Sequence, residues 1–246
     1  MFNLNGKKAL VTGSSQGIGK AIAACLAENG CEVWVQASKS LEKAQGVADE
    51  ITAKGGCAHA CAADLARLDA AQKLYAQTGD VDILILNASV QIRKPWQEIT
   101  PEDFDLQITV NLKQTLLLIQ RYAPHMLQQH WGRIVTVGSI QQAKPHKDML
   151  VYAASKDAQF NLVRNLAKQI SGGGVTINNM APGTIVTPRN SAVLEDAAYR
   201  TACEQAVPCG RLGKPEDCAA AVLLLCSDEG GYITGENIYC DGGMHL

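Results

Sequence analysis

The sequence contains no apolar run close to the roughly 20 residues that a membrane-spanning helix requires. It also has no strong excess of one charge, because 22 Lys and Arg face 24 Asp and Glu, a formal net charge of −2. That balance gives no reason to expect nucleic acid or an anionic membrane as a partner. Residues 2–8 are polar and do not resemble a secretory signal. We therefore expect a cytoplasmic protein with neither kind of partner.

Cysteine is plentiful, but metal-ligand and disulfide patterns are lacking. The nine cysteines are an odd number, and most of them stand in apolar stretches. Without an export signal they are expected to be free, buried thiols. Cys57 and Cys61 flank His59 in an alternating, strand-like segment, and no second pair of ligands follows. We therefore expect no metal site.

What the sequence does contain is a regular alternation of strand-like and helical segments. Strand patterns cover residues 7–12, 31–37, 57–63, 81–86, 133–137, 175–180 and 237–240. Helical patterns cover residues up to 29, then 41–54, 68–77, 102–129, 151–170 and 215–227. The alternation predicts an α/β fold, a single Rossmann-type doubly wound parallel sheet of about seven strands with helices on both faces. One domain over residues 1–246 is expected, with residues 186–213, which lack core periodicity, as a lid over the substrate.

A glycine-rich turn separates the first strand from the first helix. Residues 10–19 read Leu-Val-Thr-Gly-Ser-Ser-Gln-Gly-Ile-Gly. Glycines let the backbone approach a ligand closely, and the helix N-terminus that follows attracts an anion. The stretch favours a pyrophosphate site, although such a turn can also be purely structural.

Tyr152 and Lys156 stand four residues apart at the start of a helix, so they share one face. A phenol has a pKa of about 10, and a nearby ammonium favours the phenolate. Lowering that pKa by about three units requires roughly 4 kcal/mol, within reach of one or two close charges. Tyr152 would then exchange a proton with a carbonyl oxygen as hydride reaches its carbon, and Ser139 would bond the same oxygen. Taken singly, a core tyrosine and a solvated lysine are the alternative interpretation.

Taken in order, these stretches resemble the short-chain dehydrogenase/reductase superfamily in its shorter form. The resemblance covers nearly the whole chain and rests on Thr12-Gly13-x-x-x-Gly17-Ile18-Gly19, Asn87-Ala88, Asn111, Ser139, Tyr152-x-x-x-Lys156, Pro182-Gly183-x-x-x-Thr187 and Asp241-Gly242-Gly243. It implies an NAD(P)(H)-dependent oxidoreductase that interconverts a ketone and a secondary alcohol. One departure is Leu86-Asn87-Ala88-Ser89, where the superfamily usually reads Asn-Asn-Ala-Gly.

The resemblance also implies roles for individual residues. Tyr152 is the acid/base, Ser139 orients the substrate oxygen, and Lys156 lowers the pKa of Tyr152 and holds the nicotinamide ribose. Asn111 supports a water that links Lys156 to solvent. The implied cofactor contacts are Gly13, Ser15, Gln16, Gly17, Ile18, Gly19, Ser38, Lys39, Asp64, Leu65, Asn87, Ala88, Tyr152, Lys156, Pro182, Gly183, Ile185 and Thr187.

The end of the second strand bears on which nicotinamide cofactor is used. It reads Gln36-Ala37-Ser38-Lys39, with no acid to bind the ribose 2′-hydroxyl. Ser38 can donate a hydrogen bond and Lys39 supplies positive charge, which favours NADP(H) over NAD(H). Lys39 as a solvated surface lysine is the alternative, and Gln16 stands where NADP-preferring relatives often carry arginine.

The substrate stays open between a sugar acid, a polyol and a 3-oxoacyl thioester. Residues 91–96 are similar to the corresponding stretch of gluconate 5-dehydrogenases, where basic residues would suit a carboxylate. Elsewhere the chain resembles 3-oxoacyl-[acyl-carrier-protein] reductases about as well, and Arg93, Lys94 and Arg133 would then face an acidic carrier protein. A catalytically idle dinucleotide-binding regulator or scaffold on the same fold is the alternative function. By the resemblance, the chain forms a homotetramer or homodimer.

Overall fold

The computed structural model describes residues 2–246 and contains one seven-stranded parallel sheet. The strand order is β3-β2-β1-β4-β5-β6-β7. The strands are β1 (Lys8–Val11), β2 (Glu32–Ala37), β3 (Cys57–Ala62), β4 (Ile83–Leu86), β5 (Gly132–Val137), β6 (Val175–Pro182) and β7 (Asn237–Cys240). Because β1 pairs with both β2 and β4, the strand order reverses there, as in a doubly wound fold. The predicted fold class is confirmed.

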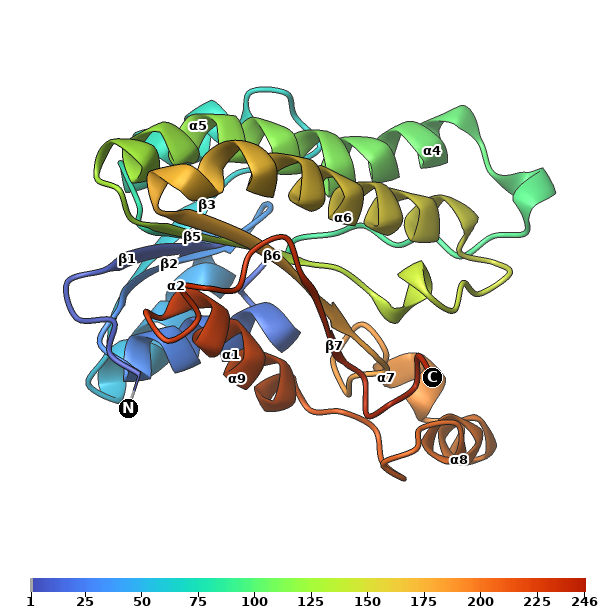
Figure 1. Cartoon of the computed structure of the whole chain (residues 1–246). Coiled ribbons are helices and arrows are strands. Elements are labelled where there is room, and N and C mark those ends of the chain that lie inside the picture. The colour runs from blue at the N-terminus through green and yellow to red at the C-terminus, as the bar shows by residue number, and fades with distance from the viewer. Residues whose placement is uncertain (1) are drawn as a thin grey trace.

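Helices cover both faces of the sheet (Figure 1). One face carries α1 (Gly17–Glu28), α2 (Leu41–Ala53) and α9 (Pro215–Cys226). The other carries α3 (Ala70–Thr78), α4 (Pro101–Ile108), α5 (Gln114–Gln128) and α6 (Leu150–Ile170). Each layer buries its own apolar cluster against the sheet, and together the two clusters hold the strand ends in place.

The helix expected over residues 102–129 is interrupted. A π-helical turn, η2 (Thr109–Lys113), separates α4 from α5. It buries Asn111 completely, and the Asn111 side chain binds the backbone of Val90 through both of its polar atoms, at 2.8 and 2.9 Å. The π turn therefore fastens the loop after β4 to the helical layer. Such turns are frequent at functional sites.

The segment 186–213 contains two short helices, α7 (Ser191–Leu194) and α8 (Ala197–Gln205). No residue of α8 is buried, which explains why the sequence shows no core periodicity there. The two ends of the segment are fastened together, because the Val186 amide donates to Gly213 at 2.9 Å and the Gly213 amide donates to Thr184 at 3.0 Å. The segment leaves the sheet and returns to it at one place.

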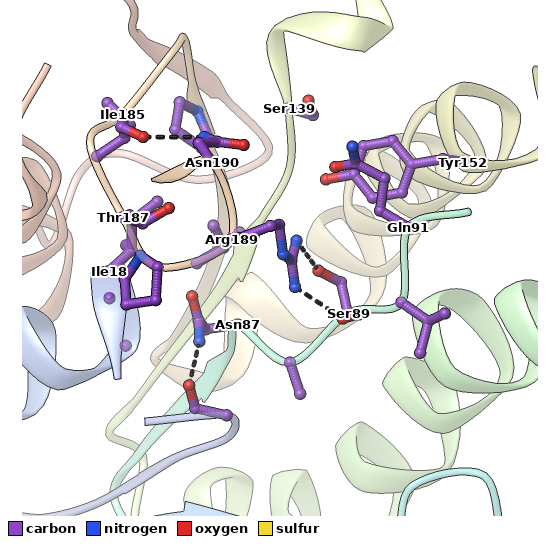
Figure 2. Close-up of a pocket in the computed structure, with 18 of the residues that line it drawn as sticks. Ile18, Asn87, Ser89, Gln91, Ser139, Tyr152, Ile185, Thr187, Arg189 and Asn190 are labelled. Carbon is purple, nitrogen blue, oxygen red and sulfur yellow. Dashed lines mark hydrogen bonds between the residues drawn. The ribbon is translucent and has the colours of Figure 1, made fainter. Parts of the chain in front are cut away.

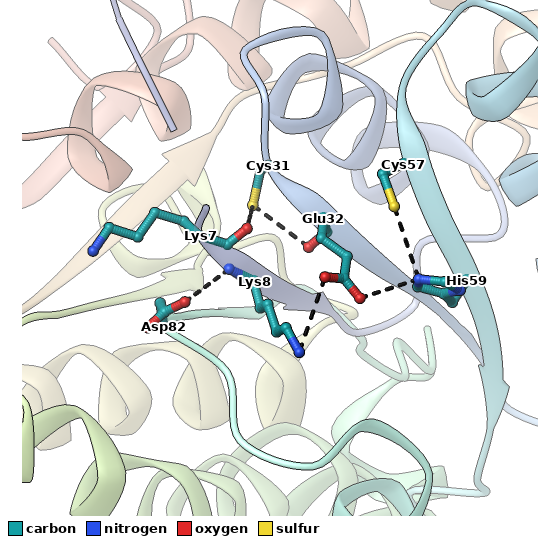
Figure 3. A network of polar contacts seen from close by, with 7 residues as sticks. All are labelled: Lys7, Lys8, Cys31, Glu32, Cys57, His59 and Asp82. Atoms are coloured by element: carbon teal, nitrogen blue, oxygen red, sulfur yellow. Dashed lines mark hydrogen bonds and ion pairs between the residues drawn. The ribbon is translucent and has the colours of Figure 1, made fainter. Parts of the chain in front are cut away.

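A polar network joins the amino ends of the first strands (Figure 3). Glu32 accepts from His59 at 3.1 Å and lies 3.9 Å from the Lys8 ammonium, while the Lys8 amide donates to Asp82 at 2.8 Å. All nine cysteines are free, but only four are buried: three are half-buried, and Cys57, in this network, and Cys209 are exposed. Within residues 2–246 no three His, Cys, Asp or Glu side chains are grouped to hold a metal ion.

Over the described residues, no helix combines the length and apolarity needed to cross a membrane.

Arg133, expected to face a carrier protein, is instead only 5% exposed. It donates to the carbonyls of Ser227 and Gly132 at 3.1 and 3.0 Å. That part of the prediction is wrong, because the arginine starts a central strand at the amino end of the sheet and fastens it to the chain after α9.

Candidate active site

A cavity of about 670 Å³ opens at the carboxyl ends of the strands, next to the reversal between β1 and β4. The structure brings most of the predicted residues together there. Those that line the cavity are Gly13, Ser15, Gln16, Gly17, Ile18, Gly19, Ser38, Lys39, Asp64, Leu65, Asn87, Ala88, Ser139, Tyr152, Pro182, Gly183, Ile185 and Thr187. Lys156 and Asn111 are outside this lining and fully buried.

The glycine turn has the geometry that an anion site requires. Gly13 and Gly17 have φ values of +63° and +57°, in the region that favours glycine. A Cβ on Gly19 would lie 2.6 Å from the Gly13 carbonyl oxygen and 2.8 Å from the Ser14 Cα, so the turn admits no larger residue there. The side chain of Gln16, at the N-cap of α1, makes no capping hydrogen bond within residues 2–246. The first N–H groups of α1 are therefore available to a pyrophosphate.

Gln36 shapes this turn, a role that the sequence analysis did not give it. The side chain is buried, accepts from the Gly13 amide at 2.7 Å, and donates to the carbonyls of Ala37 and Ala63 at 2.7 and 2.8 Å. An amide in an otherwise valine-rich strand was the available signal. Gln36 thereby fixes the loop after β1 to the ends of β2 and β3.

Asn87 fastens the other side of the turn. Its side-chain amide donates to the carbonyls of Thr12 and Gly13 at 2.9 and 3.0 Å, and its backbone amide donates to the Thr12 hydroxyl at 3.0 Å. The ends of β1 and β4, the paired strands at the reversal, are therefore bridged next to the cavity.

Tyr152 and Ser139 face the same cavity from α6 and from the end of β5 (Figure 2). The Ser139 oxygen accepts from the Gln141 amide at 3.2 Å, so its own proton stays available to a ligand. Among residues 2–246 the Tyr152 hydroxyl has no hydrogen-bond partner, although the rest of the side chain is almost entirely buried. Both hydroxyls can therefore bind one oxygen atom of a molecule in the cavity.

Lys156 lies in the protein interior beside Tyr152. Its ammonium donates to the Val137 carbonyl at 2.6 Å and to the Gln159 side-chain oxygen at 3.1 Å, and lies 6.0 Å from the centre of the Tyr152 ring. Burial, together with the positive charge of Arg189, lowers the pKa of Lys156 to about 7. The predicted pairing of the two residues is thus a buried amine next to a phenol ring.

Positive charge gathers on the side of the cavity formed by the segments after β4 and β6. Arg189 reaches across it and donates to the hydroxyl of Ser89 at 3.0 Å and to the Ser89 carbonyl at 2.8 Å (Figure 2). Arg93 also lines the cavity, 3.4 Å from a ring nitrogen of His146. Lys94 does not, because it pairs with Asp103 at 2.6 Å.

The opposite end of the cavity holds Ser38, Lys39 and Asp64. Asp64 accepts from the Ser38 hydroxyl at 3.3 Å and from the Ala66 amide at 3.1 Å. Among the cavity-lining residues of the described chain, Asp64 is the only carboxylate. The cavity therefore has an end with one acid and an end with only basic and neutral groups.

Comparison with known proteins gives matches along the whole chain. The family model described as Enoyl-(Acyl carrier protein) reductase matches residues 13–245. The 3-oxoacyl-[acyl-carrier-protein] reductase FabG of Staphylococcus epidermidis is 35% identical over 244 residues, which cover 98% of this chain and 99% of the relative.

Two solved structures superimpose closely. A 3-oxoacyl (acyl-carrier-protein) reductase from Agrobacterium tumefaciens C58 with NADP bound has a TM-score of 0.95 at 38% identity, covering 98% of this chain and 95% of that one. A gluconate 5-dehydrogenase from Burkholderia cenocepacia J2315 in complex with NADP and tartrate has a TM-score of 0.92 at 31% identity, covering 99% and 96%. On these matches, the chain belongs to the short-chain dehydrogenase/reductase family of oxidoreductases.

Proposed function

We propose that this oxidoreductase interconverts a ketone and a secondary alcohol, with Tyr152 as the acid/base. The observation that carries the proposal is the unpartnered Tyr152 hydroxyl, which faces the same cavity as the glycine turn. When bound, the nicotinamide supplies the hydride in reduction and accepts it in oxidation. Tyr152 gives its proton to the carbonyl oxygen in reduction and removes the hydroxyl proton in oxidation. Ser139 holds the same oxygen, and the Lys156 ammonium favours the phenolate.

NADP(H) fits the cavity better than NAD(H). The glycine turn offers backbone N–H groups to the pyrophosphate, and Ser38 and Lys39 line the place expected for a 2′-phosphate. Lys39 supplies a cation there, and the Ser38 hydroxyl, which donates to Asp64 in the structure, would have to turn toward the phosphate to bind it. Both structural neighbours described above contain NADP, which supports this choice. Asp64 lies nearby, but its carboxylate already accepts two hydrogen bonds from the chain.

A carboxylate-bearing substrate, such as a sugar acid, suits the basic end of the cavity. Arg93, Arg189 and His146 line it, and within the described part of the chain neither guanidinium forms an ion pair with a carboxylate. A guanidinium binds a carboxylate through two parallel hydrogen bonds. The neighbour from Burkholderia cenocepacia holds tartrate, a dicarboxylate, which supports the same class. Residues 186–213 would close over this substrate as a lid.

The test is oxidation of NADPH and NADH with three classes of ketone: keto sugar acids, neutral ketoses and 3-oxoacyl thioesters. We expect turnover with NADPH and a keto acid, and a loss of about 10²–10⁴-fold in kcat for Tyr152→Phe. Persistent activity in that variant contradicts the mechanism. Tight NADPH binding without turnover of any carbonyl favours the idle dinucleotide-binding protein instead, and turnover of thioesters alone favours an acyl reductase.

A further inference from the structure

Gln159 is a buried amide on α6, one turn after Lys156. It is 1% exposed, and all of its polar side-chain atoms have partners. The side-chain oxygen accepts from the Lys156 ammonium at 3.1 Å. The side-chain nitrogen donates to the backbone carbonyl of Asn111 at 3.1 Å and to the Thr115 hydroxyl at 2.7 Å. One amide thus joins Lys156 to the π turn and to the first turn of α5.

The chemistry of the partners fixes which way the amide points. A backbone carbonyl can only accept, so the nitrogen must face Asn111, and an ammonium can only donate, so the oxygen must face Lys156. The Thr115 hydroxyl already donates to the Asn111 carbonyl at 2.9 Å, which leaves its oxygen free to accept from Gln159. A reversed amide would lose its bonds to Asn111 and Lys156, and it could keep the bond to Thr115 only if that hydroxyl gave up its own bond to the Asn111 carbonyl. The orientation is therefore determined by the network itself.

Lys156 depends on this amide for its geometry. Its ammonium has three protons, of which Val137 and Gln159 accept two, and the third can be donated beside Tyr152. The groups that act on its charge are Tyr152 on the same helix and Arg189 from the segment after β6. In the described chain no carboxylate pairs with it. A neutral amide therefore does the work of a counter-ion in holding the amine.

We propose that Gln159 is a positioning residue, whose amide fixes the direction of the Lys156 ammonium and maintains its charge beside Tyr152. The inference rests on the proposed roles of Tyr152 and Lys156. It also names the physical link between Lys156 and Asn111, which is the Gln159 side chain. Thr115 supports this link by holding the amide nitrogen.

Gln159→Glu and Gln159→Leu should act in opposite directions. The glutamate places a negative charge against the ammonium, so the pH limb of kcat/KM that follows Lys156 moves up by about one unit or more. The leucine removes the acceptor, so the limb moves down and kcat falls about tenfold at neutral pH. Gln169→Leu, an exposed position on the same helix, is the matched control and should match the unmodified enzyme.

A second measurement does not need turnover. Protein labelled with 13C-lysine is titrated by NMR, and the Lys156 signal is assigned by its loss in Lys156→Met. Opposite shifts of the Lys156 titration in the two Gln159 variants support the inference, whether or not a substrate has been found. An active enzyme in which both variants titrate like the unmodified protein, or shift in the same direction, overturns it. If Gln159→Leu does not fold, the Gln159→Glu titration decides alone, and an absent upward shift overturns the inference. Failure of the proposed function would instead appear as no turnover by any variant.

Discussion

Arg189 and Ser89 join the segment after β6 to the end of β4 across the candidate active site. The guanidinium donates to the Ser89 hydroxyl at 3.0 Å and to its carbonyl at 2.8 Å. Ser89 is the residue that departs from the glycine usual in the superfamily, and glycine would lack the hydroxyl that Arg189 uses. Within residues 2–246 Arg189 forms no ion pair, so a substrate carboxylate would be its first anionic partner.

Arg189→Ala should raise KM for a keto acid about 10- to 100-fold, because a hydrogen bond between charged groups contributes about 1.5–3 kcal/mol. KM for a neutral ketone of similar size should change much less. The KM of Arg189→Lys for the keto acid should lie between that of the unmodified enzyme and that of Arg189→Ala, since lysine keeps the charge but not the fork of two donors. Steady-state kinetics on both substrates give the comparison, with Arg200→Ala on α8 as the control. An equal rise in KM for the acid and for the neutral ketone would show that Arg189 does not recognise the carboxylate.

Lys39→Glu should change the choice of cofactor. The substitution replaces attraction for a 2′-phosphate by repulsion, so kcat/KM should fall about tenfold or more with NADPH and stay level or rise with NADH. The ratio of the two values, measured with one substrate, is the readout. Lys54→Ala, at the exposed end of α2, is the matched control. An equal fall in kcat/KM with both cofactors would mean that the lysine has only a general effect on the turn.

Gly19→Ala should reduce both stability and NADPH affinity. The added Cβ would meet backbone atoms of Gly13 and Ser14, which cannot move without opening the turn, so a loss of about 1–3 kcal/mol in the free energy of unfolding is expected. Gly46→Ala in α2 is the control, because nothing lies within 4 Å of its added Cβ. It should raise stability by about 0.5–1 kcal/mol and leave binding unchanged. Urea unfolding and cofactor titration check both variants, and an unaffected Gly19→Ala protein would contradict the described turn.

Lys156 should make stability depend on pH. Its pKa is about 7 when folded and near the ordinary lysine value of 10.5 when unfolded. Between these values the unfolded chain binds more protons, so stability rises with pH, and below about 7 the contribution is flat. The free energy of unfolding relative to Lys156→Met should therefore increase by about 1 kcal/mol from pH 7 to pH 8. Urea unfolding of both proteins across pH 6–8 measures the difference, and a constant difference would contradict the lowered pKa.

The sheet and most of the cavity lining follow from local sequence. Continuous apolar runs mark parallel strands, and Gly13, Asn87 and Ser139 all stand just beyond strand ends, which parallel topology brings to one edge. These signals depend on spacing within a few residues. They can therefore be recognised without knowledge of tertiary contacts.

Contacts between distant side chains were not predictable in this way. The π turn at Asn111 inserts into an apolar pattern that is compatible with a continuous helix. Gln159 looks like any polar residue on α6 until Asn111 and Lys156 are placed on either side of it. The sequence around Arg133 predicts contact with a carrier protein, because the burial of this side chain depends on the chain after α9, which lies far away in sequence.

The backbone bridge between Ile185 and Gly213 has a consequence for how this protein can change. The stretch between the two residues contains no strand of the sheet and contacts the rest of the chain through loop residues, among them Arg189 with Ser89 and Cys209 with Gly242. Its length and composition can therefore vary without disturbing any strand. Exchanging the whole stretch for that of a relative, with both attachment points kept, offers a way to change which ligands the protein binds while the rest of the candidate active site stays the same.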